Sequence, residues 1–171
     1  MKNLIAPHGS DTLKPLFIQG SSERNSLTEA SKEMPKLLLN SAAAANAVML
    51  GAGYFTPLDG FMNKKNAINV AENMVTEDGL FWPVPIVNLS KTVDGITVGD
   101  DVALLDPNVD GTPVLAIQKI SAIEKLTDDE IKSIASKIFG TLDKEHPGVA
   151  NFLSLGNYMI SGSIKVLNYS Y

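Results

Sequence analysis

The sequence of 171 residues contains no cysteine, one arginine, one tryptophan and two histidines. Without cysteine, the chain can form neither a disulfide bond nor a thiolate metal site, and it has no thiol nucleophile. The two histidines, His8 and His146, are too few for a three-ligand zinc site unless carboxylates complete it, and no His-Glu-x-x-His spacing occurs. These absences exclude most thiol and zinc chemistry and predict no metal site.

The sequence also has no run of 18 apolar residues and no secretory signal behind Met1. We therefore expect a soluble, cytoplasmic protein with no membrane partner. Lysine and arginine total 14 against 19 acidic residues, which gives a formal net charge of −5. The densest basic cluster is only Lys64-Lys65. Because phosphate backbones are bound by clustered cations, we expect no nucleic-acid partner.

A hydrophobic content of 44% in a chain of this length indicates one globular domain, residues 1–171, that buries roughly two-thirds of its unfolded surface. Apolar spacing and end signals predict three helices, at 35–50, 63–74 and 127–140. The third has the clearest start, because Thr127 and Glu130 form a capping-box pattern. In the second, Ala67, Ile68, Ala71 and Met74 form the apolar stripe.

Short segments rich in valine, isoleucine and leucine predict strands at 84–89, 101–105, 113–123 and 158–167. Turn pairs such as Asp94-Gly95 and Asp110-Gly111 separate them. Pro83 and Pro85 lack backbone donors, so the first strand should lie at an edge or begin there. Short strands mixed with helices indicate an α+β class and a small, partly closed barrel.

Each candidate for chemistry has a structural interpretation that we favour. Pro147 and Gly148 suit the middle of a type II turn, which gives His146 a turn or packing role, and His8 lies near a flexible chain start. The glycines of 51–53 are expected to end a helix, because no Gly-Lys-Ser/Thr follows them as in a phosphate loop. The acidic runs 128–130 and 100–101 are expected on the solvated surface. The sequence therefore predicts no catalytic, cofactor-binding or metal-binding residue.

Five segments carry a resemblance to a known family, in the family's order: Leu4–Leu16, Gly53–Met62, Trp82–Leu89, Asp106–Gln118 and Ile138–Gly162. The last reads IFGTLDKEHPGVANFLSLGNYMISG. Together they resemble the N-terminal domain of the ATP sulfurylase (sulfate adenylyltransferase) family, while Asn40–Val48 is plainer than the charged helix of many members. The resemblance implies a PUA-like pseudo-barrel of short mixed strands with two or three packing helices.

The family's catalytic motifs, Gln-x-Arg-Asn-Pro and Gly-Arg-Asp-His, do not occur here, and Arg24 is the one arginine. The resemblance thus implies a non-catalytic fragment that ends before the catalytic nucleotidyltransferase domain. It needs no cofactor itself, whereas its parent would use ATP and magnesium to convert ATP and sulfate into adenylyl sulfate and diphosphate, in sulfate assimilation or sulfur oxidation. The expected partners are the catalytic domain of the same polypeptide and further copies in a homo-oligomer.

Two other functions are compatible with parts of the sequence. PUA-like folds often bind RNA, so a freestanding RNA-binding module is the alternative, although the acidic balance disfavours it. A small independent enzyme would need a polar cluster that the sequence does not show. The loop 55–62 is expected to be structural, with Phe55, Leu58, Phe61 and Met62 as an apolar plug around a turn made by Asp59-Gly60. We expect these apolar side chains to be buried beneath the loop rather than exposed as a contact surface for a catalytic domain.

Overall fold

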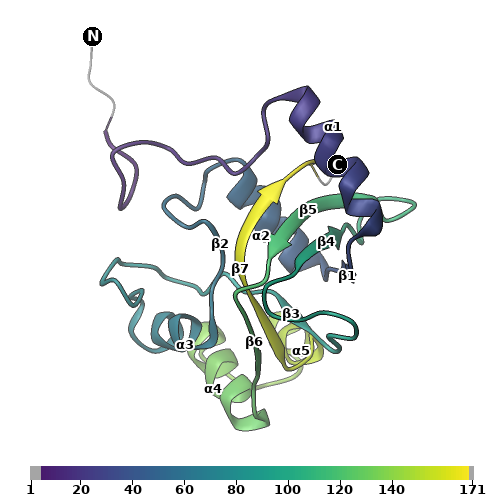
Figure 1. The fold of residues 1–171 in the computed structure, drawn as a ribbon. Coiled ribbons are helices and arrows are strands. Elements are labelled where there is room, and N and C mark those ends of the chain that lie inside the picture. Colours follow the sequence, from purple (N-terminus) through teal and green to yellow (C-terminus); the bar gives the residue numbers. More distant parts are fainter. Residues whose placement is uncertain (1–4, 170–171) are drawn as a thin grey trace. The chain divides into compact units, whose positions relative to one another are not determined.

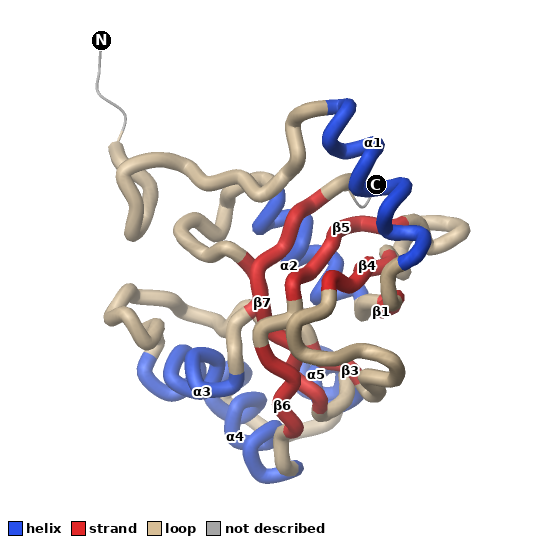
Figure 2. The backbone as a smooth tube through the Cα atoms, viewed as in Figure 1, coloured by secondary structure: helices blue, strands red, loops and turns tan. Residues whose placement is uncertain are grey.

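The computed structural model describes residues 5–169. Figure 1 labels its helices and strands, and Figure 2 distinguishes them from the loops by colour. The chain divides into two compact units. The first contains the chain up to residue 60, residues 101–119 and the chain from residue 163 onward, and the second contains residues 61–100 and 120–162. Elements of the first unit are α1 (Ser21–Ala30), η1 (Ser31–Glu33), β1 (Lys36–Leu38), α2 (Ser41–Gly51), β4 (Asp101–Leu105) and β5 (Val114–Lys119). Those of the second are α3 (Lys64–Asn73), β3 (Leu89–Ser90), β6 (Ala122–Lys125), α4 (Asp128–Phe139) and α5 (Pro147–Ser154). Two strands, β2 (Gly60–Phe61) and β7 (Tyr158–Val166), have residues in both units.

In the first unit, four neighbouring strand segments form a mixed sheet. Strand β1 runs parallel to β4, β4 is antiparallel to β5, and β5 is antiparallel to the C-terminal half of β7. The side chains of Val102, Leu104, Leu115 and Val166 are completely buried, which makes this sheet the core of the unit. Helix α2 approaches the sheet closely, since a Cβ on Gly51 would lie 2.9 Å from a methyl carbon of Val166.

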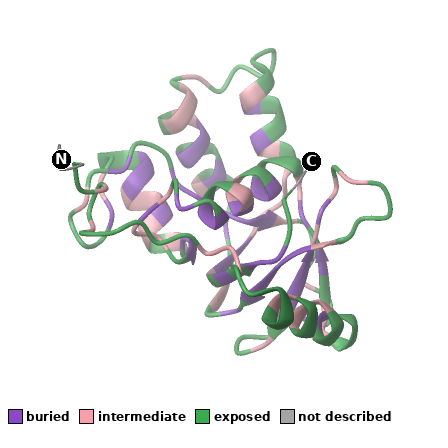
Figure 3. Cartoon of the chain, turned by 90° about the horizontal axis from the view of Figure 1, so that it is seen from above, coloured by how far each residue is buried: buried purple, intermediate pink, exposed green. Residues whose placement is uncertain are grey.

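In the second unit, the N-terminal half of β7 pairs antiparallel with both β6 and β3. Helix α4 contacts α3 and α5. Its buried residues are Ile131, Ile134 and Ala135, and those of α3 are Ala67, Val70 and Ala71. Buried residues lie mainly on the strands and on one side of the helices, while the loops are mostly exposed (Figure 3).

The helix predictions are partly confirmed. Helices α3 and α4 begin after the expected N-caps, Asn63 and Thr127, and α4 carries the complete capping box and ends at Gly140 with a φ of 69°. The predicted start of the first helix is wrong, because residues 36–38 form β1 and the helix begins only after Asn40, whose side chain accepts the Ala43 N–H. Helices α1 and α5 were not predicted.

The strand predictions are also partly confirmed. The segments 101–105 and 158–167 correspond to β4 and β7. The segment 113–123 forms two strands, β5 and β6, which belong to different units. The strand predicted at 84–89 is wrong, since only Leu89 and Ser90 pair in β3 and the segment with Pro83 and Pro85 is irregular. The α+β class with short mixed strands is confirmed.

Candidate functional site

The histidine of the His-Pro-Gly segment is a helix cap. The Nδ1 atom of His146 accepts the N–H groups of Gly148 (3.1 Å) and Val149 (3.4 Å) at the start of α5, and Pro147 occupies the first helical position. The predicted type II turn is therefore wrong, because Gly148 continues a helix. The predicted turn or packing role of His146 agrees with the structure: its ring centroid lies 5.5 Å from that of Phe139.

The glycine of the same segment lies close to two aromatic side chains. A Cβ on Gly148 would lie 2.7 Å from Cε1 of Phe139 and 3.1 Å from Cε1 of His146. Phe139 also meets Phe152 edge to face, with ring centroids 6.1 Å apart. The residues that carried the strongest resemblance thus join the end of α4 to the start of α5.

The glycines of 51–53 end α2, as expected. Gly51 is the last helical residue, and Gly53 has a φ of 81° with the backbone nitrogen of Pro15 at 3.2 Å from the place of an added Cβ. Thr56 Oγ1 donates to the Gly53 carbonyl (2.7 Å) and accepts the Lys14 N–H (3.0 Å). The backbone here holds the N-terminal segment against the helix end, which leaves no phosphate cradle at these glycines.

The apolar loop 55–62 is buried at its C-terminal end. Phe61 and Met62 are each 4% exposed, whereas Phe55 and Leu58 are half-buried. The turn expected at Asp59-Gly60 is wrong, because Gly60 belongs to β2 and the Asp59 carbonyl accepts the Ile164 N–H. The interpretation of Phe61 as a core residue is confirmed.

The densest basic cluster is neutralised by carboxylates. Lys64 Nζ lies 2.6 Å from Glu130, and Lys65 Nζ lies 2.6 Å from Glu77. The hydrogen bond from Lys64, with a further one from the Thr127 N–H, lowers the pKa of Glu130. The hydrogen bond to Glu77 raises the pKa of Lys65. Both lysines are thus held in ion pairs within the second unit.

A shallow groove of about 380 Å³ lies beside α3. It is lined by Lys65, Ile68, Asn69, Glu72 and Glu77. Its ionisable groups are one lysine and two glutamates, and the lysine is already paired with one of the glutamates. ATP with magnesium carries net negative charge and needs cations or backbone donors around its phosphates. The residues of this groove therefore do not fit ATP.

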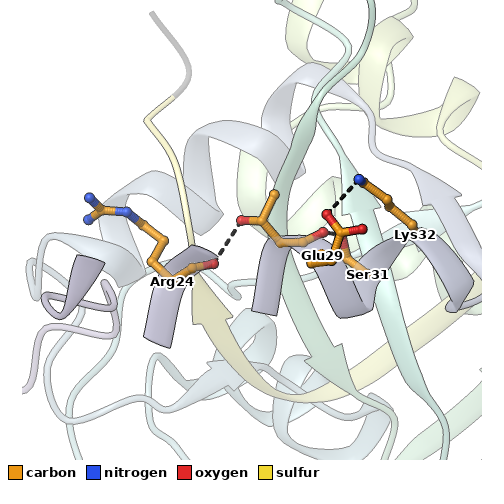
Figure 4. A network of polar contacts seen from close by, with 5 residues as sticks. Arg24, Glu29, Ser31 and Lys32 are labelled. Carbon is orange, nitrogen blue, oxygen red and sulfur yellow. Dashed lines mark hydrogen bonds and ion pairs between the residues drawn. The ribbon is translucent and has the colours of Figure 1, made fainter. Parts of the chain in front are cut away.

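The single arginine is used for local packing in the first unit. The Arg24 guanidinium donates to the Ile18 carbonyl (3.1 Å) and lies 5.2 Å from the centre of the Phe17 ring. Its backbone carbonyl accepts the Thr28 hydroxyl, and farther along the chain Lys32 pairs with Glu29 (Figure 4). The Arg24 guanidinium is thus occupied by contacts within its own segment.

The acidic runs lie on the surface, as expected. Asp128 and Asp129 are exposed at the start of α4, and Asp101 is exposed at the start of β4. Asp100 is half-buried and accepts the Thr97 N–H.

Within residues 5–169, no group of three or more histidine, aspartate or glutamate side chains could hold a metal ion. His8 is exposed.

Sequence reasoning missed an exposed apolar surface. Met74, assigned to the buried stripe of its helix, is instead 53% exposed, and Phe81 (58%) and Val84 (45%) are exposed close by in the sequence. The stripe ends at Ala71, because the helix stops at Asn73 and Met74 adopts a φ of 55°.

In the described chain, no helix is both long enough and apolar enough to span a bilayer.

The family model of the PUA-like domain matches residues 5–169, and the chain belongs to that family. Its curated relatives include sulfate adenylyltransferases. It is 52% identical over 171 residues to that of Alcanivorax borkumensis, covering 100% of this chain and 43% of the relative. It is 45% identical to that of Allochromatium vinosum, covering 98% of this chain and 42% of the relative. It is 40% identical to that of the Riftia pachyptila sulfur-oxidizing endosymbiont, covering 98% of this chain and 38% of the relative. The resemblance predicted from the motifs is confirmed.

The chain spans about two-fifths of the length of these relatives. A solved structure, the hexameric APS kinase from Thiobacillus denitrificans, matches 96% of this chain and 27% of its own chain, with a TM-score of 0.66 and 24% identity. That likeness shows a shared fold.

Proposed function

We propose that this chain is the PUA-like N-terminal part of a sulfate adenylyltransferase and that it supports the catalytic part without performing chemistry itself. The observation that carries the proposal is the match of the whole chain to about two-fifths of enzymes with that name. The complete protein would convert ATP and sulfate into adenylyl sulfate and diphosphate with magnesium, in sulfate assimilation or sulfur oxidation.

The charge distribution supports a scaffold. Adenylyl transfer brings two anions together, so the reacting site must collect cations and hydrogen-bond donors. The densest basic cluster, Lys64-Lys65, is paired with glutamates, and Arg24 is held in local packing, so neither offers a cationic site among the described residues. The catalytic residues and the ATP and magnesium sites would therefore lie in the other part of the polypeptide. We place the complete enzyme in the cytoplasm, where ATP is available.

The test uses a chimera. The segment of the Alcanivorax borkumensis enzyme that matches this chain is replaced by this chain, and diphosphate release from ATP with sulfate and magnesium is measured. We expect an active chimera and no turnover by the 171-residue chain alone. Turnover by the isolated chain well above a protein-free blank, or an inactive chimera, would contradict the proposal.

Association with further copies is part of the same proposal for the complete protein. The similar solved structure, an APS kinase, is a hexamer, and this supports an assembly of several copies. Sedimentation of the active chimera measures the assembly: a homo-oligomer is expected, and a chimera that is active as a monomer would contradict this part.

A further inference from the structure

A hairpin in the second unit, residues 74–84, displays three apolar side chains. Met74 is 53% exposed, Phe81 58% and Val84 45%. The N–H of Trp82 donates to the carbonyl of Met74 (2.8 Å), so the backbone at Trp82, next to Phe81 and two residues before Val84, lies beside Met74. Monomeric proteins seldom expose several large apolar side chains together unless a partner covers them.

Hydrogen bonds within the hairpin and to α3 hold this segment in place. Val75 pairs with Phe81, and the Thr76 N–H donates to the Leu80 carbonyl (2.8 Å). The side chain of Asn69 on α3 donates to the Val75 carbonyl (2.6 Å). Trp82, 7% exposed, anchors the hairpin in the unit. A surface held in this way loses little conformational entropy when it binds.

Met74 occupies a backbone position that disfavours it. Its φ of 55° lies in the left-handed region, where helix ends usually carry glycine or asparagine. A glycine there would relieve the strain but would remove the exposed side chain. Methionine is common at binding surfaces because its flexible thioether adapts to a partner. The disfavoured backbone position and the exposed side chain together support a contact outside the chain.

The surroundings of the hairpin are acidic. Glu72, Glu77 and Asp78 are exposed, and the nearby Lys65 is paired with Glu77. A complementary partner would present an apolar face with cations around it. The other three-fifths of the relatives' length has no counterpart here. Under the proposed function, that part would hold the cations that two anionic substrates require.

We propose that the 74–84 hairpin is the surface on which the catalytic part of the same polypeptide docks. The proposal rests on the proposed function, and the partner is the remaining part of the enzyme rather than a second copy of this chain. Met74, Phe81 and Val84 supply the apolar centre of the contact, and the carboxylates of Glu72 and Asp78 supply its rim.

The first experiment compares backbone hydrogen exchange of the 74–84 hairpin in the isolated chain and in the active chimera. Slower exchange of the hairpin in the chimera is expected, with little change around Val98, which is 61% exposed elsewhere in the same unit. An active chimera whose hairpin exchanges as in the isolated chain would overturn the docking surface and leave the proposed function standing. An inactive chimera would overturn both.

The second experiment introduces Phe81→Ser into the chimera, with Val98→Ser as the matched control. Heat inactivation should become about tenfold faster with Phe81→Ser, the size of effect expected for a buried interface aromatic, and stay unchanged with Val98→Ser. Equal inactivation of both variants would overturn the proposal. Sedimentation of the isolated chain tests the other occupant: a dimer that Phe81→Ser abolishes would assign the surface to a second copy and also overturn it.

Discussion

The Nζ atom of Lys64 lies 2.6 Å from a carboxylate oxygen of Glu130. Lys64 is the first residue of α3, and Glu130 is the third residue of α4. The same glutamate accepts the Thr127 N–H in the capping box (2.8 Å). One carboxylate therefore closes the start of its own helix and ties it to the start of another.

The first prediction concerns the pH dependence of this contact. The pKa of Glu130 is lowered from 4.5, first by the hydrogen bond from Lys64 and then by that from Thr127. Its stabilising effect is therefore fully present above pH 4.5 and is lost as the pH falls through the lower value of the folded state. Glu130→Gln keeps an acceptor for Thr127 but removes the charge. We expect it to cost about 0.5 kcal/mol near neutral pH and almost nothing at strongly acidic pH.

Urea unfolding at a series of pH values measures this difference. In a Lys64→Met background, the same substitution should show a weaker pH dependence, since the main cause of the lowered pKa is gone. A cost of Glu130→Gln that stays constant from neutral to acidic pH would contradict the prediction.

The second prediction tests the core at the end of the loop 55–62. Phe61 is 4% exposed, so Phe61→Ala in the isolated chain should lower the free energy of unfolding by about 3–5 kcal/mol. The matched control is Phe81→Ala, which removes a 58% exposed ring and should cost less than about 1 kcal/mol. Chemical denaturation measures both, and similar losses for the two variants would show that Phe61 is not a core residue.

The third prediction concerns the close approach at Gly148. A methyl group there would meet the Phe139 ring at 2.7 Å, and the crowded junction between α4 and α5 must shift to receive it. We expect Gly148→Ala to destabilise the chain by about 1–3 kcal/mol. Gly20→Ala is the control, because its nearest neighbour is 3.8 Å away, and it should change stability by less than about 0.5 kcal/mol. A thermal melt of Gly148→Ala like that of the unmodified chain would count against the packing role.

The fourth prediction separates the scaffold from an RNA-binding module. A chain with a net charge of −5, whose densest lysine pair is bound to glutamates, has no basic surface there for a phosphate backbone. Binding to a mixed RNA pool at about 50 mM salt should be no tighter than on the order of 10⁻⁴ M. Filter binding or fluorescence anisotropy measures it, and a submicromolar dissociation constant would favour the RNA-binding alternative.

Local signals in the sequence were sufficient where the structure depends on local contacts. Thr127, Glu130 and Gly140 define α4 because a capping box and a glycine terminus act within one turn. Residues 36–38 are mostly apolar, like the helix that follows them in the sequence. In the structure they pair with β4, which lies more than 60 residues away in the chain. No local pattern contains that pairing, so the sequence alone favoured the wrong element.

The two missed helices have different causes. Helix α1 buries no residue among those described, so it lacks the apolar stripe that identifies most helices. Helix α5 was hidden by the turn character of Pro147-Gly148, although proline at the first helical position is itself a start signal. The exposed position of Met74 depends on where α3 stops, and the apolar spacing of the helix gives no sign of that end.

The course of the chain through the two units also limits how the domain could have been assembled or shortened. The chain leaves the first unit at residue 60, returns at 101, leaves again after 119 and returns at 163 in the middle of β7. Neither unit is a contiguous stretch of the gene, so no single cut could release one of them intact. A shortened chain that keeps one unit whole would therefore have to join segments that are separated in the sequence.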